Sequence, residues 1–596
     1  MDPSVHSRRM AGRPLLIVLM LALAPLAGCL TLGADVEPAA IGVAPAAAGV
    51  PSYLHDLSEP IDGVDVFSAI VEPVRVAAAD GILLDTWIVR PDIEGPVPLV
   101  LEVTPYFGGG TPVVREARHT NLNTAHARLL ERGYAVGISS VRGTGNSEGC
   151  FTQGGAQEAL DTAAVIEALA ALPWSNGNVG LIGVSYPGTT PQDVWVEAPP
   201  ALKTIVPISG ISDLYKYNFV NGVPINIQGF GFNTYYWAMV GLSPAGLAGG
   251  VQALDPLSVP GAVVGEGCAD QVAVQEGGVS STLDGNKDGY WQERDFLAEL
   301  SAAPGKERAS VFYVHGLQDW NVKPHMMEDW LDAVQAEGVP YKIWIGQWGH
   351  NWPQREDWFE ITMVAWFDQF LKGIDTGILD APRVQVQDDA ELWRHEDAWP
   401  PTDASWVTLH PDASGALGTQ PGSGEASYDA FDITEAIGFG TNELLPPDMV
   451  LWESAPLEED WHVSGMPVLE ANVTASARRA SLMLTLIERN ASGDRAFNFA
   501  AMSLNHVSSL AAGEDDVSGL TQLVRVRFFP QDDVVHKGSR LVLVAAANLV
   551  AGSEPGPSLQ PVGEGGTVTI SLDVASLALP LDTSIVYEDP QPLPPE

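Results

Sequence analysis

The sequence predicts an α/β domain that is followed by an all-β domain. In the first part of the chain, short apolar runs typical of buried strands alternate with helical segments. The runs lie near residues 99, 136 and 179, and the helical segments are residues 120–132 and 156–172. This alternation favours a mostly parallel, covered sheet. After residue 373, short apolar runs recur between Gly, Pro and Asp turns, which is typical of a β-sandwich.

The elements of the α/β domain follow in order along the chain. A hairpin comes first, because residues 74–76 and 82–89 are strand-like and Asp-Gly at 80–81 is a turn signal. A strand over residues 201–209 precedes a long interruption, residues 211–304, in which aromatics, glycines and helical stretches break the rhythm. Such a stretch is what an inserted cap would give, and the core resumes after it.

Ser185 lies in the string LIGVSYPG, where an apolar strand runs into Gly-x-Ser-x-x-Gly and then into a helix-like segment. This pattern is close to the nucleophile elbow of α/β-hydrolases, a sharp strand-to-helix turn that lifts the serine hydroxyl above the sheet. Gly183 and Gly188 fit the elbow because the tight turn leaves no room for a Cβ. The second glycine falls one place later than Gly-x-Ser-x-Gly requires. The interpretation of Ser185 as a nucleophile therefore depends on finding its acid and its base.

A serine nucleophile needs a base and an acid, which in α/β-hydrolases follow it in the order Ser, Asp or Glu, His. Residues 310–316 read as a strand, and Asp319 lies just past its carboxyl end. Residues 341–346 read as another strand, and His350 follows its end. Parallel sheets place catalytic groups at this edge. Alone, Asp319 could be a turn former and His350 a loop histidine, but with Ser185 they form the expected ordered set.

Six strings resemble the Xaa-Pro dipeptidyl-peptidase and cocaine-esterase family. They are VRGTGNSEG (141–149), WSNGNVG (174–180), GVSYPGT (183–189), GLQDWNVKP (316–324), WGH (348–350) and WFDQFLKG (366–373). The resemblance runs from about Val74 to near the C-terminus. It implies an α/β-hydrolase core, a helical cap inserted after the nucleophile half, and a C-terminal jelly-roll domain. The family's triad falls on Ser185, Asp319 and His350.

The predicted organisation follows from this resemblance and from the sequence pattern. The core occupies residues 63–210 and 305–380, the cap residues 211–304, and the β-domain residues 381–596; a lipoprotein signal peptide (1–29) and a flexible tether (30–62) precede them. The family also implies an oxyanion hole, in which a tyrosine hydroxyl from an early loop joins the backbone N–H after the serine. Tyr106, which follows the apolar strand 98–103, and the Tyr186 N–H are the candidates. The alternative is that Tyr106 is a half-buried core aromatic.

Composition limits the classes of partner. The chain has 75 acidic and 30 basic residues, a net charge of −45, which disfavours nucleic acid and offers no basic patch for anionic lipid. With 46% hydrophobic residues over 596 positions, it can fill two or three sizeable cores. Strong acidity also resembles proteins of salty habitats.

The N-terminus predicts export. Arg8, Arg9 and Arg13 precede the apolar run 15–24, which is short for a permanent transmembrane helix. The string LAGC then ends at Cys29 and resembles a lipobox, in which the cysteine becomes lipid-modified. The interpretation is a cell-surface or membrane-anchored lipoprotein; an ordinary secretory signal cleaved nearby is the alternative.

The other two cysteines favour a disulfide. With Cys29 used for lipid, Cys150 and Cys268 remain, an even pair in an oxidising compartment. Cys150 follows the glycine-rich loop 143–149, and Cys268 lies in the predicted cap. A bridge between them would tie the cap to the core, and two buried free thiols are the competing picture.

A calcium-like loop occupies residues 284–295. It begins DGNKDG and fits the calcium-loop pattern, except that Asp295 stands where Glu is usual. Its candidate oxygen ligands are Asp284, Asn286, Asp288 and Asp295. The alternative is a solvated acidic turn, since WQERD at residues 291–295 also resembles a cap segment of the family that needs no metal. The predicted chemistry requires no cofactor.

Two function classes remain open at this stage. One is a secreted, lipid-anchored serine hydrolase that works through an acyl-enzyme; release of Xaa-Pro dipeptides is favoured, with an ester hydrolase or acylase of the same family as the alternative. Its substrate would be a peptide or an ester, and Asp213, Glu266 and Asp270 are equal candidates to anchor a peptide amine. The other class is a non-catalytic surface-binding lipoprotein, in which the β-domain carries the function.

Overall fold

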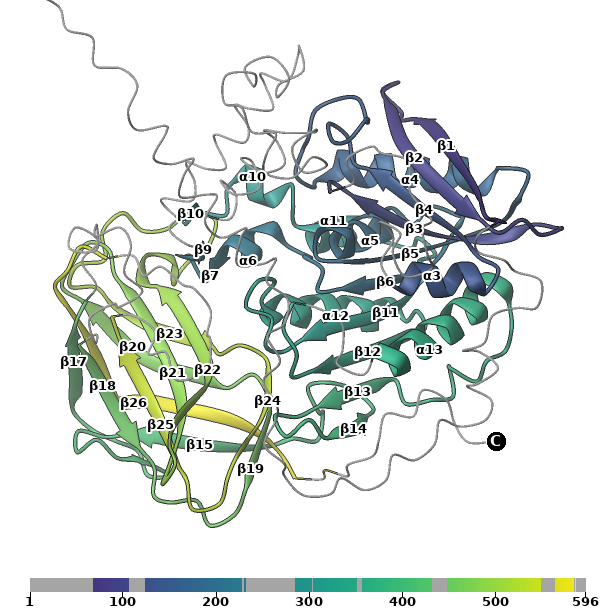
Figure 1. Cartoon of the computed structure of the whole chain (residues 1–596). Coiled ribbons are helices and arrows are strands. Elements are labelled where there is room, and N and C mark those ends of the chain that lie inside the picture. The colour runs from purple at the N-terminus through teal and green to yellow at the C-terminus, as the bar shows by residue number, and fades with distance from the viewer. Residues whose placement is uncertain are drawn as a thin grey trace, which may run out of the picture.

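A computed structural model gives the structure of the chain in two lobes, an α/β core and an all-β lobe (Figure 1). It describes residues 68–106, 124–227, 230–231, 285–302, 304–350, 356–430, 448–547, 563–583 and 585. Cys29, Cys268 and Asp284, together with the predicted signal peptide and most of the predicted cap, lie outside these residues.

The core is built on a 10-stranded sheet. In spatial order its strands are β1 (Ile70–Ala77), β2 (Leu83–Arg90), β4 (Ala135–Ser140), β3 (Val97–Thr104), β5 (Ser175–Val184), β6 (Leu202–Ile208), β11 (Ser310–Gly316), β12 (Tyr341–Gly346), β13 (Val384–Gln387) and β14 (Trp393–Glu396). Neighbours from β4 to β13 are parallel, whereas β1, β2 and β14 run antiparallel at the edges. The predicted α/β architecture and N-terminal hairpin are thereby confirmed.

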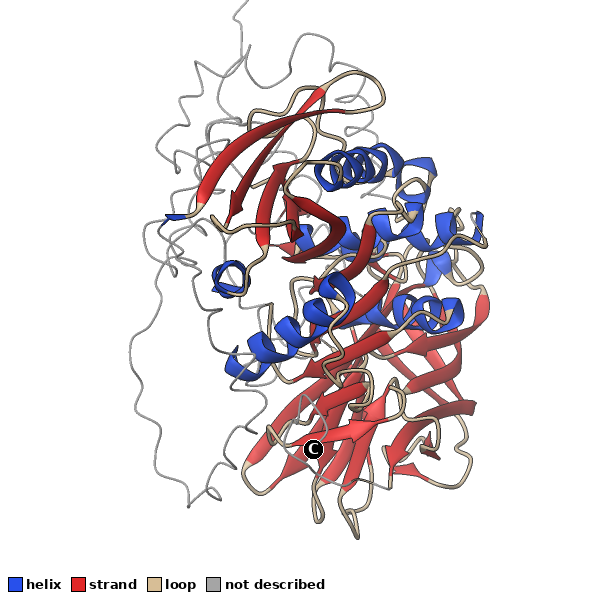
Figure 2. Ribbon diagram, turned by 90° about the vertical axis from the view of Figure 1, so that its right-hand side faces the viewer, coloured by secondary structure: helices blue, strands red, loops and turns tan. Residues whose placement is uncertain are grey.

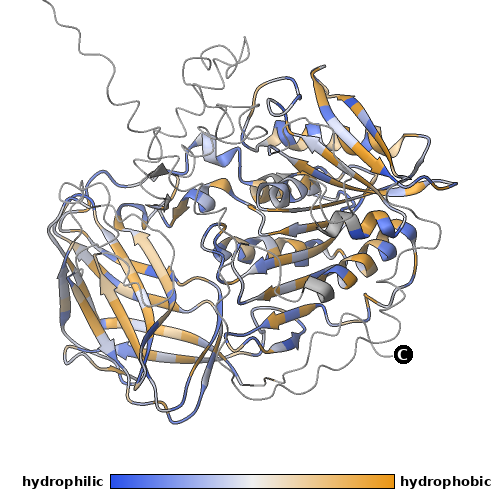
Figure 3. Ribbon diagram, in the orientation of Figure 1, coloured by the Kyte–Doolittle hydropathy of each residue, from blue (hydrophilic) through white to orange (hydrophobic). Residues whose placement is uncertain are grey.

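Helices cover both faces of this sheet (Figure 2). Four of them, α4 (Ala156–Ala170), α5 (Tyr186–Glu197), α11 (Phe296–Ala302) and α12 (Met327–Glu337), contribute to one apolar cluster. On the other face lie α3 (Thr124–Glu131), α13 (Glu356–Phe367) and the π-helical turn η5 (Asp368–Lys372), which form a second cluster around Trp366. Because both faces are covered, β4 and β11 are buried at every position, and Figure 3 shows apolar residues concentrated on the strands.

The predicted cap is only partly described. Its described elements are α6 (Leu214–Asn218), β7 (Phe219–Val220), β8 (Val223–Pro224), β9 (Asn226–Ile227), β10 (Phe230–Gly231), α10 (Gly289–Gln292) and α11. They are short, and they reach the all-β lobe, since the Ser503 N–H donates to the Asn221 carbonyl at 2.9 Å. The cap therefore contacts both lobes.

The all-β lobe, called the β-domain below, pairs two antiparallel sheets around one apolar core. The 4-stranded sheet has the order β18 (Met449–Glu453), β25 (Arg540–Ala546), β21 (Ser481–Asn490) and β22 (Gly493–Ser503). The 8-stranded sheet contains β15 (Ser405–Pro411), β16 (Leu417–Gly418), β17 (Glu425–Asp429), β19 (Trp461–Gly465), β20 (Val468–Ala475), β23 (Thr521–Arg527), β24 (Gln531–Val535) and β26 (Thr567–Asp582). The predicted C-terminal sandwich is confirmed.

The predicted domain boundary at residue 381 is wrong. Strands β13 and β14 lie beyond it, yet β13 pairs in parallel with β12 and therefore belongs to the core sheet. The first strand of the β-domain is β15, which begins at Ser405. Strand-like patterning is the same in both lobes, and only the hydrogen-bonding partner decides to which sheet a strand belongs.

Candidate active site

Ser185 occupies a strained turn between β5 and α5. Its backbone has φ 69° and ψ −125°, a conformation that a side-chain-bearing residue rarely adopts. The turn is held from both sides, because the Ser185 N–H donates to the Ile208 carbonyl at 3.0 Å and the Ser185 carbonyl accepts from the Gly188 N–H at 2.8 Å. This is the geometry of a nucleophile elbow.

The shifted second glycine has a steric reason. A Cβ at Gly183 would lie 2.4 Å from the Cβ of Pro187, and a Cβ at Gly188 would lie 2.5 Å from the Ile208 carbonyl oxygen. Helix α5 thus passes so close to the end of β6 that position 188, and not 187, must be glycine. The proline at 187 stands in the first turn of α5, where its missing N–H leaves no hydrogen bond unmade.

Asp319 and His350 are in direct contact. His350 Nδ1 lies 2.8 Å from Asp319 Oδ2, with Asp319 fully buried and His350 about a quarter exposed. The second oxygen, Asp319 Oδ1, accepts from the N–H groups of Asn321 and Val322 at 3.0 and 2.9 Å. Burial by itself would raise the pKa of Asp319, but His350, the nearby His315 and the Ser209 hydroxyl hold it below the ordinary value. A carboxylate that accepts a hydrogen bond from the Nδ1–H group leaves Nε2 as the basic nitrogen of the imidazole.

The three predicted residues share one edge of the sheet. Ser185 follows β5, Asp319 follows β11 and His350 follows β12, and these strands are parallel, with β6 between the first two. Parallel strands present their carboxyl ends at the same edge. The structure therefore places all three residues on adjoining loops and joins the acid to the histidine.

Tyr106 and Tyr186, the predicted oxyanion donors, lie beside each other. Tyr106 follows β3 at the same sheet edge, is 40% exposed, and sets its ring edge-on to that of Tyr186 with the centroids 6.2 Å apart. Tyr186 is the first residue of α5, so its N–H lies directly after the elbow. Tyr106 therefore lies at the sheet edge that carries Ser185, and its role as an oxyanion donor with the Tyr186 N–H stays a prediction.

Glu158 is a residue that the sequence did not single out. This fully buried carboxyl on α4 accepts a hydrogen bond from the Tyr186 hydroxyl at 2.8 Å, and its other oxygen accepts from the Gly154 N–H at 3.0 Å. Burial raises the pKa of Glu158. The Tyr186 side chain, which follows the nucleophile in the sequence, is thus held by Glu158, a partner 28 positions away. The available signal was an acidic residue at a buried position of an amphipathic helix.

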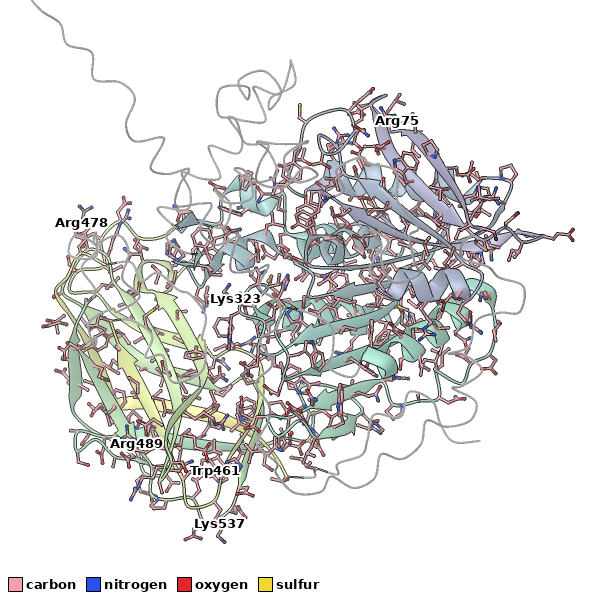
Figure 4. All side chains as sticks on the ribbon, in the orientation of Figure 1. Arg75, Lys323, Trp461, Arg478, Arg489 and Lys537 are labelled. Carbon is pink, nitrogen blue, oxygen red and sulfur yellow. The ribbon has the colours of Figure 1, made fainter. Side chains whose placement is uncertain are left out.

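Two further ionisable groups, His315 and Lys323, lie behind Asp319. His315 Nε2 donates to the Val322 carbonyl at 2.8 Å, so its Nδ1 accepts from the Tyr313 hydroxyl, and burial lowers the pKa of His315. Burial also lowers the pKa of Lys323 to about 7, although Asp319 opposes this. Figure 4 places Lys323 where the core faces the β-domain.

The calcium-like loop uses its described polar groups for protein contacts. Asn286 accepts from the Gly513 N–H at 2.7 Å, Asp288 caps α10, and Asp295 pairs with Lys287 at 2.6 Å. Lys287 also pairs with Asp213 at 2.7 Å, so its one ammonium lies between the two carboxylates. Among the described residues, no group of three or more His, Cys, Asp or Glu residues is suited to a metal. Calcium binding stays an untested prediction, since Asp284 lies outside them.

Cys150 is disulfide-bonded, in line with an oxidising compartment. Both other cysteines of the chain, Cys29 and Cys268, lie outside the described residues. The pairing with Cys268 therefore stays a prediction.

Comparison with solved structures gives the fold. A crystal structure of an aminopeptidase from the marine sediment archaeon Thaumarchaeota archaeon superposes with a TM-score of 0.66 at 19% identity, covering 90% of this chain and 99% of that one. A CocE/NonD family hydrolase from Staphylococcus aureus gives 0.65 at 18% identity, covering 89% and 98%. An α-amino acid ester hydrolase gives 0.63 at 19% identity, covering 92% and 100%. The chain thus shares its fold, with an α/β-hydrolase core, with these proteins.

Sequence comparison gives the family. The model described as X-Pro dipeptidyl-peptidase (S15 family) matches residues 80–352, and the model of the X-Pro dipeptidyl-peptidase C-terminal non-catalytic domain matches residues 376–573. A Bacillus cereus protein named "Putative Xaa-Pro dipeptidyl-peptidase" is 30% identical over 434 residues, covering 67% of this chain and 70% of the relative. A Bacillus anthracis protein of the same name is 29% identical over 471 residues, covering 74% and 75%. The chain belongs to the X-Pro dipeptidyl-peptidase family of serine hydrolases.

Proposed function

We propose that the chain is an exported, lipid-anchored Xaa-Pro dipeptidyl-peptidase in which Ser185, His350 and Asp319 form the catalytic triad. The observation that carries this proposal is the 2.8 Å contact between His350 Nδ1 and Asp319 Oδ2 at the sheet edge where Ser185 sits in a strained elbow. A buried carboxylate that orients a part-exposed histidine gives the base that a serine nucleophile needs.

The proposed mechanism assigns one proton path. His350 Nε2 takes the proton of the Ser185 hydroxyl while the oxygen attacks the carbonyl carbon of the substrate, and Asp319 holds the imidazole in the right tautomer and stabilises its positive charge. The tetrahedral oxyanion then accepts hydrogen bonds from the Tyr106 hydroxyl and the Tyr186 N–H. Collapse expels the amine, which His350 protonates. Water repeats the same steps on the acyl-enzyme, and no cofactor takes part.

The substrate class rests on the family. Both family models and the two Bacillus relatives carry the X-Pro dipeptidyl-peptidase description, which favours a peptide with proline at its second position. Such a substrate brings a free amine that needs an acidic partner. Asp213 is already paired with Lys287 at 2.7 Å, which leaves Glu266 and Asp270 of the earlier candidates; both lie outside the described residues. An ester hydrolase or acylase is the second candidate, since an α-amino acid ester hydrolase shares the fold.

A substrate panel separates these candidates. We expect the full chain to release the chromophore from Xaa-Pro anilides with a kcat/KM at least about tenfold above that for matched Xaa-Ala anilides or short-chain aryl esters, because a proline pocket contributes only with the matching ring. The reverse order would assign the ester hydrolase. Absence of any turnover, together with no labelling of Ser185 by a fluorophosphonate probe, would instead favour the non-catalytic surface-binding lipoprotein.

Export and anchoring form a separate part of the proposal. None of the helices in the described ranges is long and apolar enough to cross a membrane. The string that ends at Cys29 supports a lipid anchor, and the disulfide at Cys150 supports an oxidising compartment. Stable attachment by lipid takes more than one acyl chain.

Cys29→Ser is expected to move the protein from the membrane fraction to the soluble fraction, because the serine cannot take the lipid. Fractionation and immunoblotting of cells that express the full chain measure this. Ser52→Ala serves as the control, since it lies in the predicted tether and leaves the lipobox cysteine and the predicted disulfide intact. A Cys29→Ser protein that still sediments with membranes would refute the anchor and leave the catalytic proposal untouched.

A further inference from the structure

Strand β24 of the β-domain lies directly behind the loop that carries Asp319. Its first residue, Gln531, is fully buried, and its side-chain Nε2 donates to the Leu317 carbonyl at 2.9 Å. Leu317 stands two residues before Asp319 and at the end of β11. A side chain that is 214 positions away in the sequence thus holds the backbone of the acid loop, which we define as residues 317–322.

The histidine loop, defined as residues 347–350, is held by the same strand. Gln347 Nε2 donates to the backbone carbonyl of Asp532 at 2.8 Å. The two loops are also joined to each other, because Gln318 Nε2 donates to Gln347 Oε1 at 2.8 Å and the Gln318 N–H donates to the Trp348 carbonyl at 3.1 Å. The acid loop, the histidine loop and β24 therefore form one hydrogen-bonded unit.

Strand β24 is itself fixed to the core. The fully buried carboxylate of Asp532 accepts two hydrogen bonds from Arg394, at 2.6 and 2.5 Å, in a bidentate pair. Arg394 belongs to β14 of the core sheet, whereas His462 Nε2 and the Ser464 hydroxyl, 2.7 and 2.6 Å from the carboxylate, come from β19 of the β-domain. Burial would raise the pKa of Asp532, but Arg394 and His462 hold it well below the ordinary value. The pair stays ionised, and bidentate geometry fixes direction as well as distance.

Apolar contacts also join the acid loop to the β-domain. The Trp320 ring, next to Asp319, sets its edge against Phe499 and Phe529 of the β-domain, with centroids 5.6 and 5.7 Å apart. Phe529 stands two residues before Gln531. Polar and apolar contacts thus hold the acid loop from one side, while the core sheet holds it from the other.

From this geometry we infer that Gln531 is a positioning residue for the Asp319–His350 pair, so that the β-domain, described for the family as non-catalytic, completes the active site. The inference rests on the proposed triad. Gln531 touches neither substrate nor reacting atoms; it fixes the carbonyl from which the acid loop turns. Rates of oriented reactions fall steeply when a catalytic group moves by an ångström or less, whereas substrate binding depends on other surfaces.

Gln531→Met tests the inference in the full chain. Methionine keeps the length and the unbranched shape of the side chain but has no N–H to donate. We expect kcat for the best chromogenic substrate to fall about tenfold with KM within about twofold of the wild-type value. Labelling of Ser185 by a fluorophosphonate probe should slow by a similar factor, since acylation uses the same base.

Gln522→Met is the matched control. Gln522 lies on β23 of the same domain, and its Nε2 donates to the Leu504 carbonyl at 2.9 Å, a bond of the same kind and length away from the acid loop. Both variants lose one side-chain-to-backbone bond, and thermal unfolding compares their stability. If Gln531→Met does not fold, Gln347→Met removes the bond between β24 and the histidine loop from the core side and takes its place.

The outcomes test the positioning role of Gln531 separately from the proposed catalytic triad. A loss of kcat in Gln531→Met that Gln522→Met does not share supports positioning. Wild-type kcat in Gln531→Met, or equal losses in both variants, overturns it and leaves the triad standing. If the wild-type chain shows no hydrolysis that depends on Ser185, the proposed function itself fails, and the inference fails with it.

Discussion

Ser185→Ala is expected to lower the rate of hydrolysis by several orders of magnitude. Triad members act as a unit, so without the hydroxyl His350 has no proton to take and Asp319 has no imidazolium charge to stabilise. The elbow should survive, because the strained backbone at φ 69° is held by the Ile208 carbonyl and the Gly188 N–H and not by the serine side chain. Thermal unfolding of the variant should therefore match that of the wild type.

Steady-state turnover of the preferred anilide and labelling by a fluorophosphonate measure this effect together. Ser175→Ala is the control, since Ser175 is the first residue of the same strand, β5, at the end opposite to the elbow. It should keep wild-type turnover and labelling. Retention of most activity by Ser185→Ala would place the nucleophile elsewhere and remove the basis of the proposed triad.

The site residues could be predicted because each follows a strand. Asp319 and His350 come within four residues of the ends of β11 and β12, and the parallel order of a doubly covered sheet brings such positions to one edge. Buried parallel strands are continuous apolar runs, which are easily recognised in a sequence. The chain order and the positions of the strand ends were therefore enough to predict that Asp319 and His350 lie close together.

The supports of the site could not be predicted, because they depend on contacts between distant segments. Glu158 meets Tyr186 across 28 positions, and Gln531 meets Leu317 across 214. A glutamine at the start of a strand has no local pattern that reveals which carbonyl it will reach. The same lack of a local signal hid the membership of β13 and β14 in the core sheet, which only hydrogen bonding decides.

The calcium-like loop shows how a motif can be read two ways. Alternating oxygen side chains predict a cation site, but a lysine within the loop can supply the positive charge instead. Lys287 pairs with Asp213 and Asp295 at 2.7 and 2.6 Å. Burial by itself would lower the pKa of Lys287, but the two carboxylates hold it above the ordinary value, so the ammonium stays charged. In the sequence, this lysine is only the residue between the candidate ligands Asn286 and Asp288. Nothing in the pattern shows that its ammonium pairs with the carboxylates.

Tyr106→Phe is expected to lower kcat by about ten- to a thousandfold while KM stays nearly unchanged. The phenol hydroxyl is proposed to donate to the oxyanion, whose charge develops only in the transition state, so its loss leaves ground-state binding intact. The ring keeps its edge-on contact with Tyr186 in the variant, because phenylalanine retains the aromatic body. A folding defect should therefore not accompany the loss of rate.

Tyr186→Phe distinguishes the two proposed donors, because Tyr186 contributes its backbone N–H and not its hydroxyl. The Tyr186 hydroxyl donates to Glu158 at 2.8 Å, away from the reaction, so the variant keeps the backbone donor and loses only a support. We expect a smaller fall in kcat than in Tyr106→Phe, measured on the same anilide. Wild-type kinetics in Tyr106→Phe would remove Tyr106 from the oxyanion hole. Equal losses in both variants would also count against it, because the Tyr106 hydroxyl would then matter no more than the Tyr186 hydroxyl, which is bonded to Glu158.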